Sequence, residues 1–192
     1  MSPPADRVVA SARAGRPVTD LVPGADIIDS HAHPVHEGGT GVGMRPQPKG
    51  DAGWMFELYD RMGIGTACMA SWLGIFADSS AGSDVTAEAV RRDPDRVVGY
   101  GTIDPNYVED VAAEVQRVHS DPGMLGMKPY FPRNGVAYDD PRYTPWWEYA
   151  NEHHRFALIH SSELLGTAPK GRGGPALGSL LENLTSSYPE GS

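Results

Sequence analysis

The chain has 192 residues and a formal net charge of -9 with its histidines neutral. This length provides one domain with a substantial core, but it lies at or below the usual lower limit for a complete (β/α)8 barrel. The acidic balance and the lack of a dense run of Lys and Arg argue against a nucleic-acid groove. No window approaches the roughly 18 apolar residues of a membrane span, so we expect neither nucleic acid nor a membrane as a partner.

The single cysteine and the N-terminal residues bear on the cellular location of the protein. Cys68 has no second cysteine in the chain with which to form a disulfide, which suits a reducing environment. Residues 1–22 lack the apolar core of a signal peptide. The sequence therefore predicts a cytoplasmic protein.

Strand and helix patterns alternate along the chain from residue 26. Short apolar runs predict strands beginning near residues 26, 65, 96, 124 and 156, with the later ones covering 66–70, 96–103, 124–128 and 156–160. Helical patterns cover 54–62, 108–118, 144–152 and 175–186. A further predicted helix is capped by Asp84 and stops before Pro94. This alternation predicts an α/β fold of parallel βα units with right-handed crossovers.

The spacing of these units is typical of a TIM-type (β/α)8 barrel wound one unit at a time. About five parallel strands are present, whereas closure needs about eight, so we expect a partial barrel. Residues 1–25 are predicted to be an N-terminal extension, and residues 26–192 the incomplete barrel with strands one to five. The open sheet edges of such a half-barrel favour homo-oligomerisation or pairing with a missing C-terminal half.

The first strand carries the most informative motif. Residues 27–34 read IIDSHAHP, so Asp29, His31 and His33 occupy alternate positions of a strand and share one face. Two imidazoles in this arrangement can hold one divalent ion, zinc or a first-row neighbour. The alternative is a pair of surface or core histidines without a ligand.

A third histidine ends the fifth strand. Active groups of parallel barrels lie at the carboxyl ends of the strands, so His160 can face the same cavity as His31 and His33. Three nitrogen ligands with an open position would let the ion activate water or polarise a substrate oxygen. The alternative for His160 is a core histidine with satisfied hydrogen bonds.

Other side chains follow strands two and four. Lys128 would bind an anionic substrate group, bridge two metals if carboxylated, or only reach solvent. Trp72, Tyr130 and Phe131 would line a substrate pocket or serve as packing. His36 is interpreted as a loop residue.

Four segments together resemble the amidohydrolase superfamily: IIDSHAHP, RVVGYGTIDPN, GMKPYFP, and DDPRYTPWWEYANEHHRFALIHSS. The resemblance covers about residues 26–165. It is closest to the amidohydrolase-related branch, which contains aminocarboxymuconate-semialdehyde decarboxylase and similar decarboxylases and lactonases.

The resemblance implies a role for several residues. His31, His33 and His160 match the metal ligands, and Lys128 matches a lysine that often ends strand four in this branch. It implies a metal-dependent hydrolase or decarboxylase acting on a small carboxylated or cyclic organic compound, with zinc or manganese as cofactor. The family's acid/base histidine after strand six and its aspartate after strand eight have no match, so we expect the chain alone to be inactive.

Two alternatives remain at this point. One is a non-catalytic barrel remnant or split-barrel subunit. The other is a phosphoesterase of the TatD or PHP type, which also opens with His-x-His. Those proteins need further ligands at later strand ends, whereas strands two and three end here in Ser71-Trp72 and Ile103-Asp104.

Overall fold

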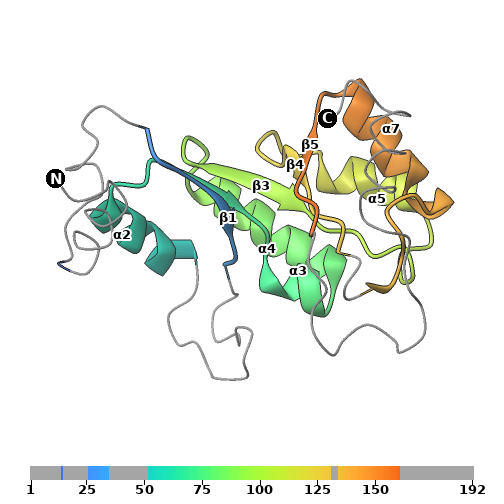
Figure 1. The fold of residues 1–192 in the computed structure, drawn as a ribbon, viewed down its shortest axis with the longest axis horizontal. Helices are drawn as coiled ribbons and strands as arrows, with labels where there is room; N and C mark the ends of the chain where they lie inside the picture. Colours follow the sequence, from blue (N-terminus) through green and yellow to red (C-terminus); the bar gives the residue numbers. More distant parts are fainter. Residues whose placement is uncertain (1–13, 15–25, 35–51, 131–133, 161–192) are drawn as a thin grey trace, which may run out of the picture.

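The computed structural model describes residue 14 and residues 26–34, 52–130 and 134–160 of the chain. Five strands run parallel in one sheet and follow one another in chain order (Figure 1). They are β1 (Ile28–Ala32), β2 (Thr66–Met69), β3 (Val97–Gly101), β4 (Gly126–Met127) and β5 (Phe156–Ala157). The sheet curls into a half-barrel with helices between its strands, which confirms the predicted partial TIM-type fold.

The helices connect successive strands. They are α2 (Ala52–Met62), α3 (Trp72–Phe76), α4 (Ser79–Arg92), α5 (Val111–Val118) and α7 (Thr144–Glu152), with a 3-10 turn, η2 (Pro141–Tyr143), before the last. Figure 1 shows α4 beside β3, and α5 and α7 gathered at one end of the molecule. The helix predicted over 175–186 lies outside the described residues. Of the helices that the structure describes, none has the length and apolar character needed to cross a membrane.

The predicted start of α4 is wrong. Asp78, not Asp84, caps this helix, because its carboxylate accepts a hydrogen bond from the Ala81 N–H at 2.9 Å. Asp84 lies inside the helix and forms an ion pair with Arg117 of α5. The strands also end earlier than predicted: β4 and β5 have two residues each.

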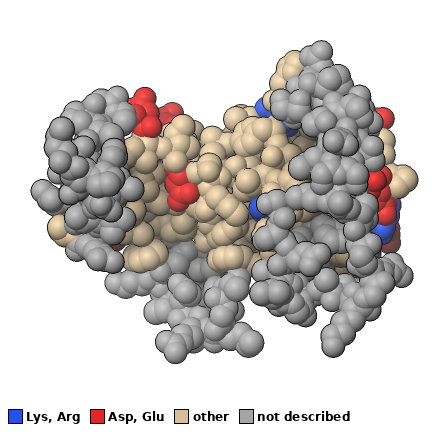
Figure 2. Space-filling view, in the orientation of Figure 1, with Lys and Arg blue, Asp and Glu red and all other residues tan. Residues whose placement is uncertain are grey.

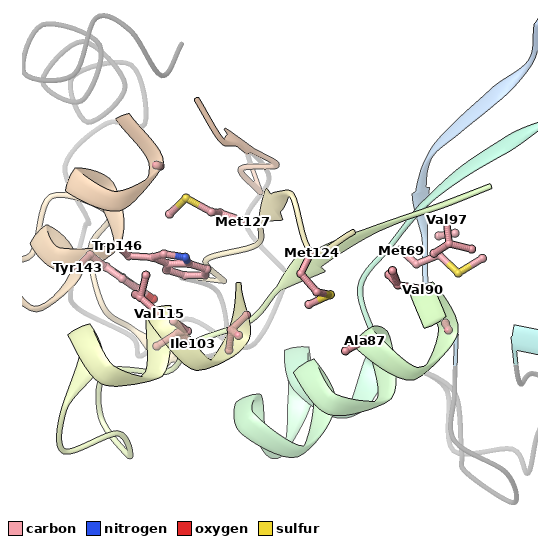
Figure 3. Close-up of a cluster of buried hydrophobic side chains, with 14 of the residues drawn as sticks. Met69, Ala87, Val90, Val97, Ile103, Val115, Met124, Met127, Tyr143 and Trp146 are labelled. Carbon is pink, nitrogen blue, oxygen red and sulfur yellow. The ribbon is translucent and has the colours of Figure 1, made fainter. Parts of the chain in front are cut away.

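The two faces of the sheet pack differently. Along β2 and the residue that follows it, alternate side chains enter two hydrophobic clusters: Ala67 and Met69 are in one, and Cys68 and Ala70 are in the other. The larger cluster, which we call the outer core, packs against α4, α5 and α7. Figure 3 shows this core running from the side of Met69 and Ala87, past Met124, to Val115, Tyr143 and Trp146.

The smaller cluster, which we call the inner cluster, lies on the opposite face of the sheet. Its buried members are Ala70, Ile75, Tyr100 and Tyr130, and Cys68, Trp72, Phe76 and Leu158 pack against them. Ala32 of β1 is buried in the outer core. Its neighbours His31 and His33 have rings in contact with each other, and the His33 ring packs on Trp72, which lies against the inner cluster.

Helix α3 is held closely against α4. A Cβ atom on Gly82 would overlap the backbone of Gly74, so glycine is required where the two helices cross. The buried Ser71 caps α3 by accepting the Leu73 N–H at 3.1 Å, while its own N–H donates to Thr86 Oγ1 at 3.0 Å. These contacts fix α3 at the carboxyl end of β2.

His119 joins α5 to α7 in the outer core. Its Nδ1 donates to the Met124 carbonyl at 2.7 Å, and its Nε2 accepts a hydrogen bond from Trp146 Nε1 at 2.9 Å. Both contacts require a neutral ring, because Nδ1 needs its proton to donate to the Met124 carbonyl and Nε2 needs its lone pair to accept from Trp146. Burial is the main reason that the pKa of His119 is lowered.

This arrangement predicts a loss of stability in acid. Between the folded-state pKa and the ordinary value of 6.5, the unfolded chain binds a proton at His119 that the folded chain does not. The free energy of unfolding should therefore fall as pH drops below 6.5, with a slope of up to about 1.4 kcal/mol per pH unit from this residue. Urea unfolding at several pH values measures the slope.

His119→Leu should reduce the slope, and it should cost about 1–3 kcal/mol at pH 7.5 because Trp146 loses its acceptor. His154→Asn is the matched control, since His154 is exposed and its φ of 51° suits asparagine. If the slope in His119→Leu equals that of the wild type, His119 is not a source of the pH dependence.

Candidate functional site

His31 and His33 meet at the carboxyl end of β1. Their ring centres lie 4.6 Å apart at an interplanar angle of 74°. Two imidazoles bound to one ion, with metal–nitrogen distances of about 2.1 Å, place their ring centres about 5 Å apart. The spacing of this pair therefore fits two ligands of one divalent cation.

The tautomer of His33 is fixed by a backbone group. Nδ1 lies 2.8 Å from the carbonyl oxygen of Ala70, which can only accept, so Nδ1 carries the proton and Nε2 keeps its lone pair. Burial lowers the pKa of His33 to about 4, against a weaker opposing effect of the Ala70 carbonyl. His33 is thus neutral at physiological pH, as a metal ligand must be.

His31 is exposed, yet its pKa is also lowered. Partial burial of the ring is the largest cause, followed by the positive charge of Lys128; Asp29 opposes both, and His160 adds a smaller lowering effect. Lys128 and His160 therefore lie near enough to His31 to lower its pKa, although they come from different strands. The topology brings these three side chains to one end of the sheet.

Asp29 and Tyr59 support the start of the motif. One carboxylate oxygen of Asp29 accepts the His31 N–H at 3.0 Å, and the other accepts the Tyr59 hydroxyl at 2.8 Å. Burial and this carboxylate raise the pKa of Tyr59. The regular alternation predicted from Asp29 to the histidines is interrupted, because the register of β1 against β2 shifts between Asp29 and Ala32. No pattern in the sequence links Asp29 to Tyr59, 30 residues further along on α2.

His160 lies beyond β5. Its backbone carbonyl accepts the Tyr138 hydroxyl at 3.1 Å, and its ring centre lies 5.0 Å from that of Tyr130. In the part of the chain that the structure describes, no group of three or more His, Cys, Asp or Glu side chains is close enough to hold a metal ion. The geometry thus fits a two-histidine pair, and the three-histidine site stays a prediction.

Lys128 is the most deeply buried charged residue near this pair. Only 1% of it is exposed, and its Nζ lies 5.8 Å from the ring centre of Tyr130. Burial lowers the pKa of Lys128 to about 8. Among the described residues, no carboxylate forms an ion pair with it.

Aromatic rings connect the two histidine positions. Ring centres lie 4.1 Å apart for His33 and Trp72, 5.0 Å for Trp72 and Phe76, 5.4 Å for Phe76 and Tyr130, and 5.0 Å for Tyr130 and His160. The sequence identified Trp72 and Tyr130 but missed Phe76. The four-residue spacing of Trp72 and Phe76 on one helix was the available signal.

Two other residues considered from the sequence, His36 and Phe131, lie outside the described residues. On the face shown in Figure 2, the described surface is mostly uncharged, with few Lys and Arg side chains. The described part of this face therefore has no basic patch of the kind that binds nucleic acid.

Comparison with known proteins identifies the family. The family model described as Amidohydrolase matches residues 28–189. The chain belongs to the amidohydrolase family. The matched range includes the histidine pair, Lys128 and His160. No curated protein sequence is significantly similar to the chain.

Solved amidohydrolase structures share the fold. A 5-carboxyvanillate decarboxylase from Novosphingobium aromaticivorans, complexed with manganese and 4-hydroxy-3-methoxy-5-nitrobenzoic acid, is 19% identical, with a TM-score of 0.62 over 87% of this chain and 63% of that one. The 5-carboxyvanillate decarboxylase LigW from Sphingomonas paucimobilis is 18% identical, with a TM-score of 0.60 over 86% and 65%. A 2,6-dihydroxybenzoate decarboxylase from Rhizobium is 17% identical, with a TM-score of 0.58 over 86% and 64%. This amidohydrolase chain thus spans slightly less than two thirds of each.

The burial of Lys128 predicts that removing its charge stabilises the chain. Below about pH 8 the ammonium is charged in both states, so the folded protein bears the full cost of burying it. Lys128→Met keeps much of the volume and should raise the free energy of unfolding at pH 7 by up to roughly 3 kcal/mol.

The pH dependence gives a second measure of the same effect. Between about pH 8 and 10.5 the unfolded chain binds a proton at Lys128 that the folded chain has lost, so wild-type stability should rise over this range. Chemical unfolding of Lys128→Met should lack that rise. Equal stability at pH 7 together with the same rise would show that Lys128 is not buried as a charge.

Proposed function

We propose that this chain provides the metal-binding half of a metal-dependent hydrolase or decarboxylase that acts on a small carboxylated ring compound. The observation that carries the proposal is the pair His31 and His33, whose ring centres lie 4.6 Å apart, with the lone pair of His33 Nε2 left to bind a metal because Nδ1 donates to the Ala70 carbonyl. His160 is the proposed third ligand, because it follows β5 at the same carboxyl end of the parallel sheet at which the pair follows β1. Zinc is the expected ion, with manganese as the alternative.

A divalent ion, when bound, supplies Lewis-acid polarisation of a substrate oxygen. The protein's own groups would position the ligands and the substrate. Asp29 restrains the backbone of His31, and the Ala70 carbonyl orients the ring of His33. The backbone of His31 and the ring of His33 are therefore positioned before any ion or substrate arrives.

Lys128 is the proposed anchor for a substrate carboxylate. An ammonium group that has lost its hydration gains strongly from an anionic partner, and the structure shows no ion pair for it among the described residues. Trp72 and Tyr130 are the proposed aromatic walls for a planar ring. The similar structures include decarboxylases of carboxylated aromatics, which agrees with this combination of groups.

The family, and the mostly uncharged described surface on the face shown in Figure 2, both suit a small-molecule substrate. We also propose a cytoplasmic location, because Cys68 has no second cysteine in the chain with which to form a disulfide. Hydrolysis and decarboxylation share the metal, the carboxylate anchor and the ring walls, and analysis of products with the full-length protein distinguishes them.

Metal binding by this chain tests the ligand pair. We expect the wild-type protein to retain zinc or manganese after dialysis and His31→Ala to lose most of it, as measured by inductively coupled plasma mass spectrometry. His154→Asn should bind as the wild type does, because His154 precedes β5 and lies at the opposite end of the strand from His160. Equal metal content in the wild type and His31→Ala would remove the assignment.

Ligand binding tests Lys128 separately. Lys128→Met should bind 2,6-dihydroxybenzoate at least about tenfold more weakly than the wild type, because the carboxylate loses a charged partner. Resorcinol, which has the same ring and hydroxyls without the carboxylate, should bind both proteins equally. Titration calorimetry measures both ligands, and an equal loss for both would point to damaged packing instead of a lost anchor.

A further inference from the structure

The short segment Ala70–Trp72, which leads from β2 into α3, contacts His33 and the residues on either side of it. The Ala70 N–H donates to the Ala32 carbonyl at 3.0 Å, and the Trp72 N–H donates to the Pro34 carbonyl at 3.3 Å. The two residues that flank His33 are therefore held by the same segment that contacts its ring.

The ring of His33 meets two groups of this segment. The Ala70 carbonyl accepts from Nδ1 at 2.8 Å, and the indole of Trp72 lies against the imidazole with ring centres 4.1 Å apart and planes tilted by 33°. The hydrogen bond fixes which nitrogen carries the proton. The indole restricts rotation of the ring about its side-chain bonds.

Trp72 is itself held in place. Its ring centre lies 5.0 Å from that of Phe76, and Ile75 of the same helix is 4% exposed. The cap at Ser71 and the glycine crossing with α4 fix the helix as a whole. A side chain on such an element can impose an orientation on its neighbour.

We propose that Trp72 is a positioning residue for His33, which holds the imidazole so that Nδ1 stays on the Ala70 carbonyl and Nε2 points outward as a ligand. The consequence for metal affinity rests on the function proposed above. The consequence for the tautomer of His33 does not, because it concerns the metal-free chain.

The first experiment reads the tautomer without metal. Long-range proton–nitrogen correlation spectra of protein with 15N-labelled histidine should show His33 with a protonated Nδ1 and an unprotonated Nε2. Trp72→Leu should lose this pure state and give averaged nitrogen shifts. Trp54→Leu is the matched control, because the same substitution is made on α2 at a residue that is 39% exposed, and it should leave the His33 signals unchanged.

The second experiment measures affinity for Zn²⁺ and Mn²⁺ by competition with a chromophoric chelator. Groups that orient a metal-ligating histidine typically contribute about 10- to 100-fold to affinity, so Trp72→Leu should weaken binding by at least about tenfold. In a His33→Ala background the same substitution should change affinity less than about twofold, because Trp72 then has no ligand to orient. An equal loss in both backgrounds would show a merely structural role and overturn the proposal.

Trp72→Phe provides a variant that keeps an aromatic face if Trp72→Leu does not fold. We expect its affinity to lie between those of the wild type and Trp72→Leu, with a partly averaged His33 spectrum. Wild-type affinity together with a wild-type spectrum in this variant would overturn the inference. A wild-type chain that binds neither ion defeats the proposed function, while the tautomer spectra still decide the role of Trp72.

Discussion

The hydrogen bond from His33 to the Ala70 carbonyl joins the fold to the candidate chemistry. It exists because β1 and β2 are parallel neighbours that both end at the same edge of the sheet. The chain leaving β2 therefore passes directly beside the histidines that leave β1. Any change that shifts the register of these two strands would move the acceptor away from the ring and release its tautomer.

Side chains that alternate along the strands give the two faces of the sheet different roles. Residues such as Met69 and Val97 enter the outer core, where burial of apolar surface stabilises the fold. Their neighbours face inward, where Lys128 is buried at a cost to stability. A costly buried charge on one face can persist because the other face supplies most of the packing, and such a cost is typical of functional sites.

The sequence predicts the fold well wherever hydrophobic periodicity reports on burial. The five strands and the helix from residue 144 to 152 are found where the pattern places them. The start of α4 was misplaced because its buried face begins with small and polar residues, Ser79, Gly82 and Ser83, which a hydrophobic pattern does not register. Helix α3 was missed because it has five residues, one of them a glycine that elsewhere signals a turn.

For the candidate site, too, local features can be predicted from the sequence and long-range contacts cannot. Strand alternation anticipates that His31 and His33 share a face, since this depends on local geometry alone. The contacts of Tyr59 with Asp29 and of Trp72 with His33 depend on how segments 30 or more residues apart meet, and no local pattern encodes them. The candidate metal ligands can be predicted from the sequence, whereas the residues that contact and orient them are visible only in the tertiary structure.

Different kinds of contact hold the two sides of the candidate site. His33 is bounded by backbone hydrogen bonds at both flanking residues and by two contacts to its ring. His160 follows β5, where its carbonyl accepts the Tyr138 hydroxyl and its ring lies edge-on to that of Tyr130. Because one segment holds both the backbone around His33 and its ring, the orientation of this proposed ligand would be set before an ion binds, which reduces the conformational free energy lost on coordination.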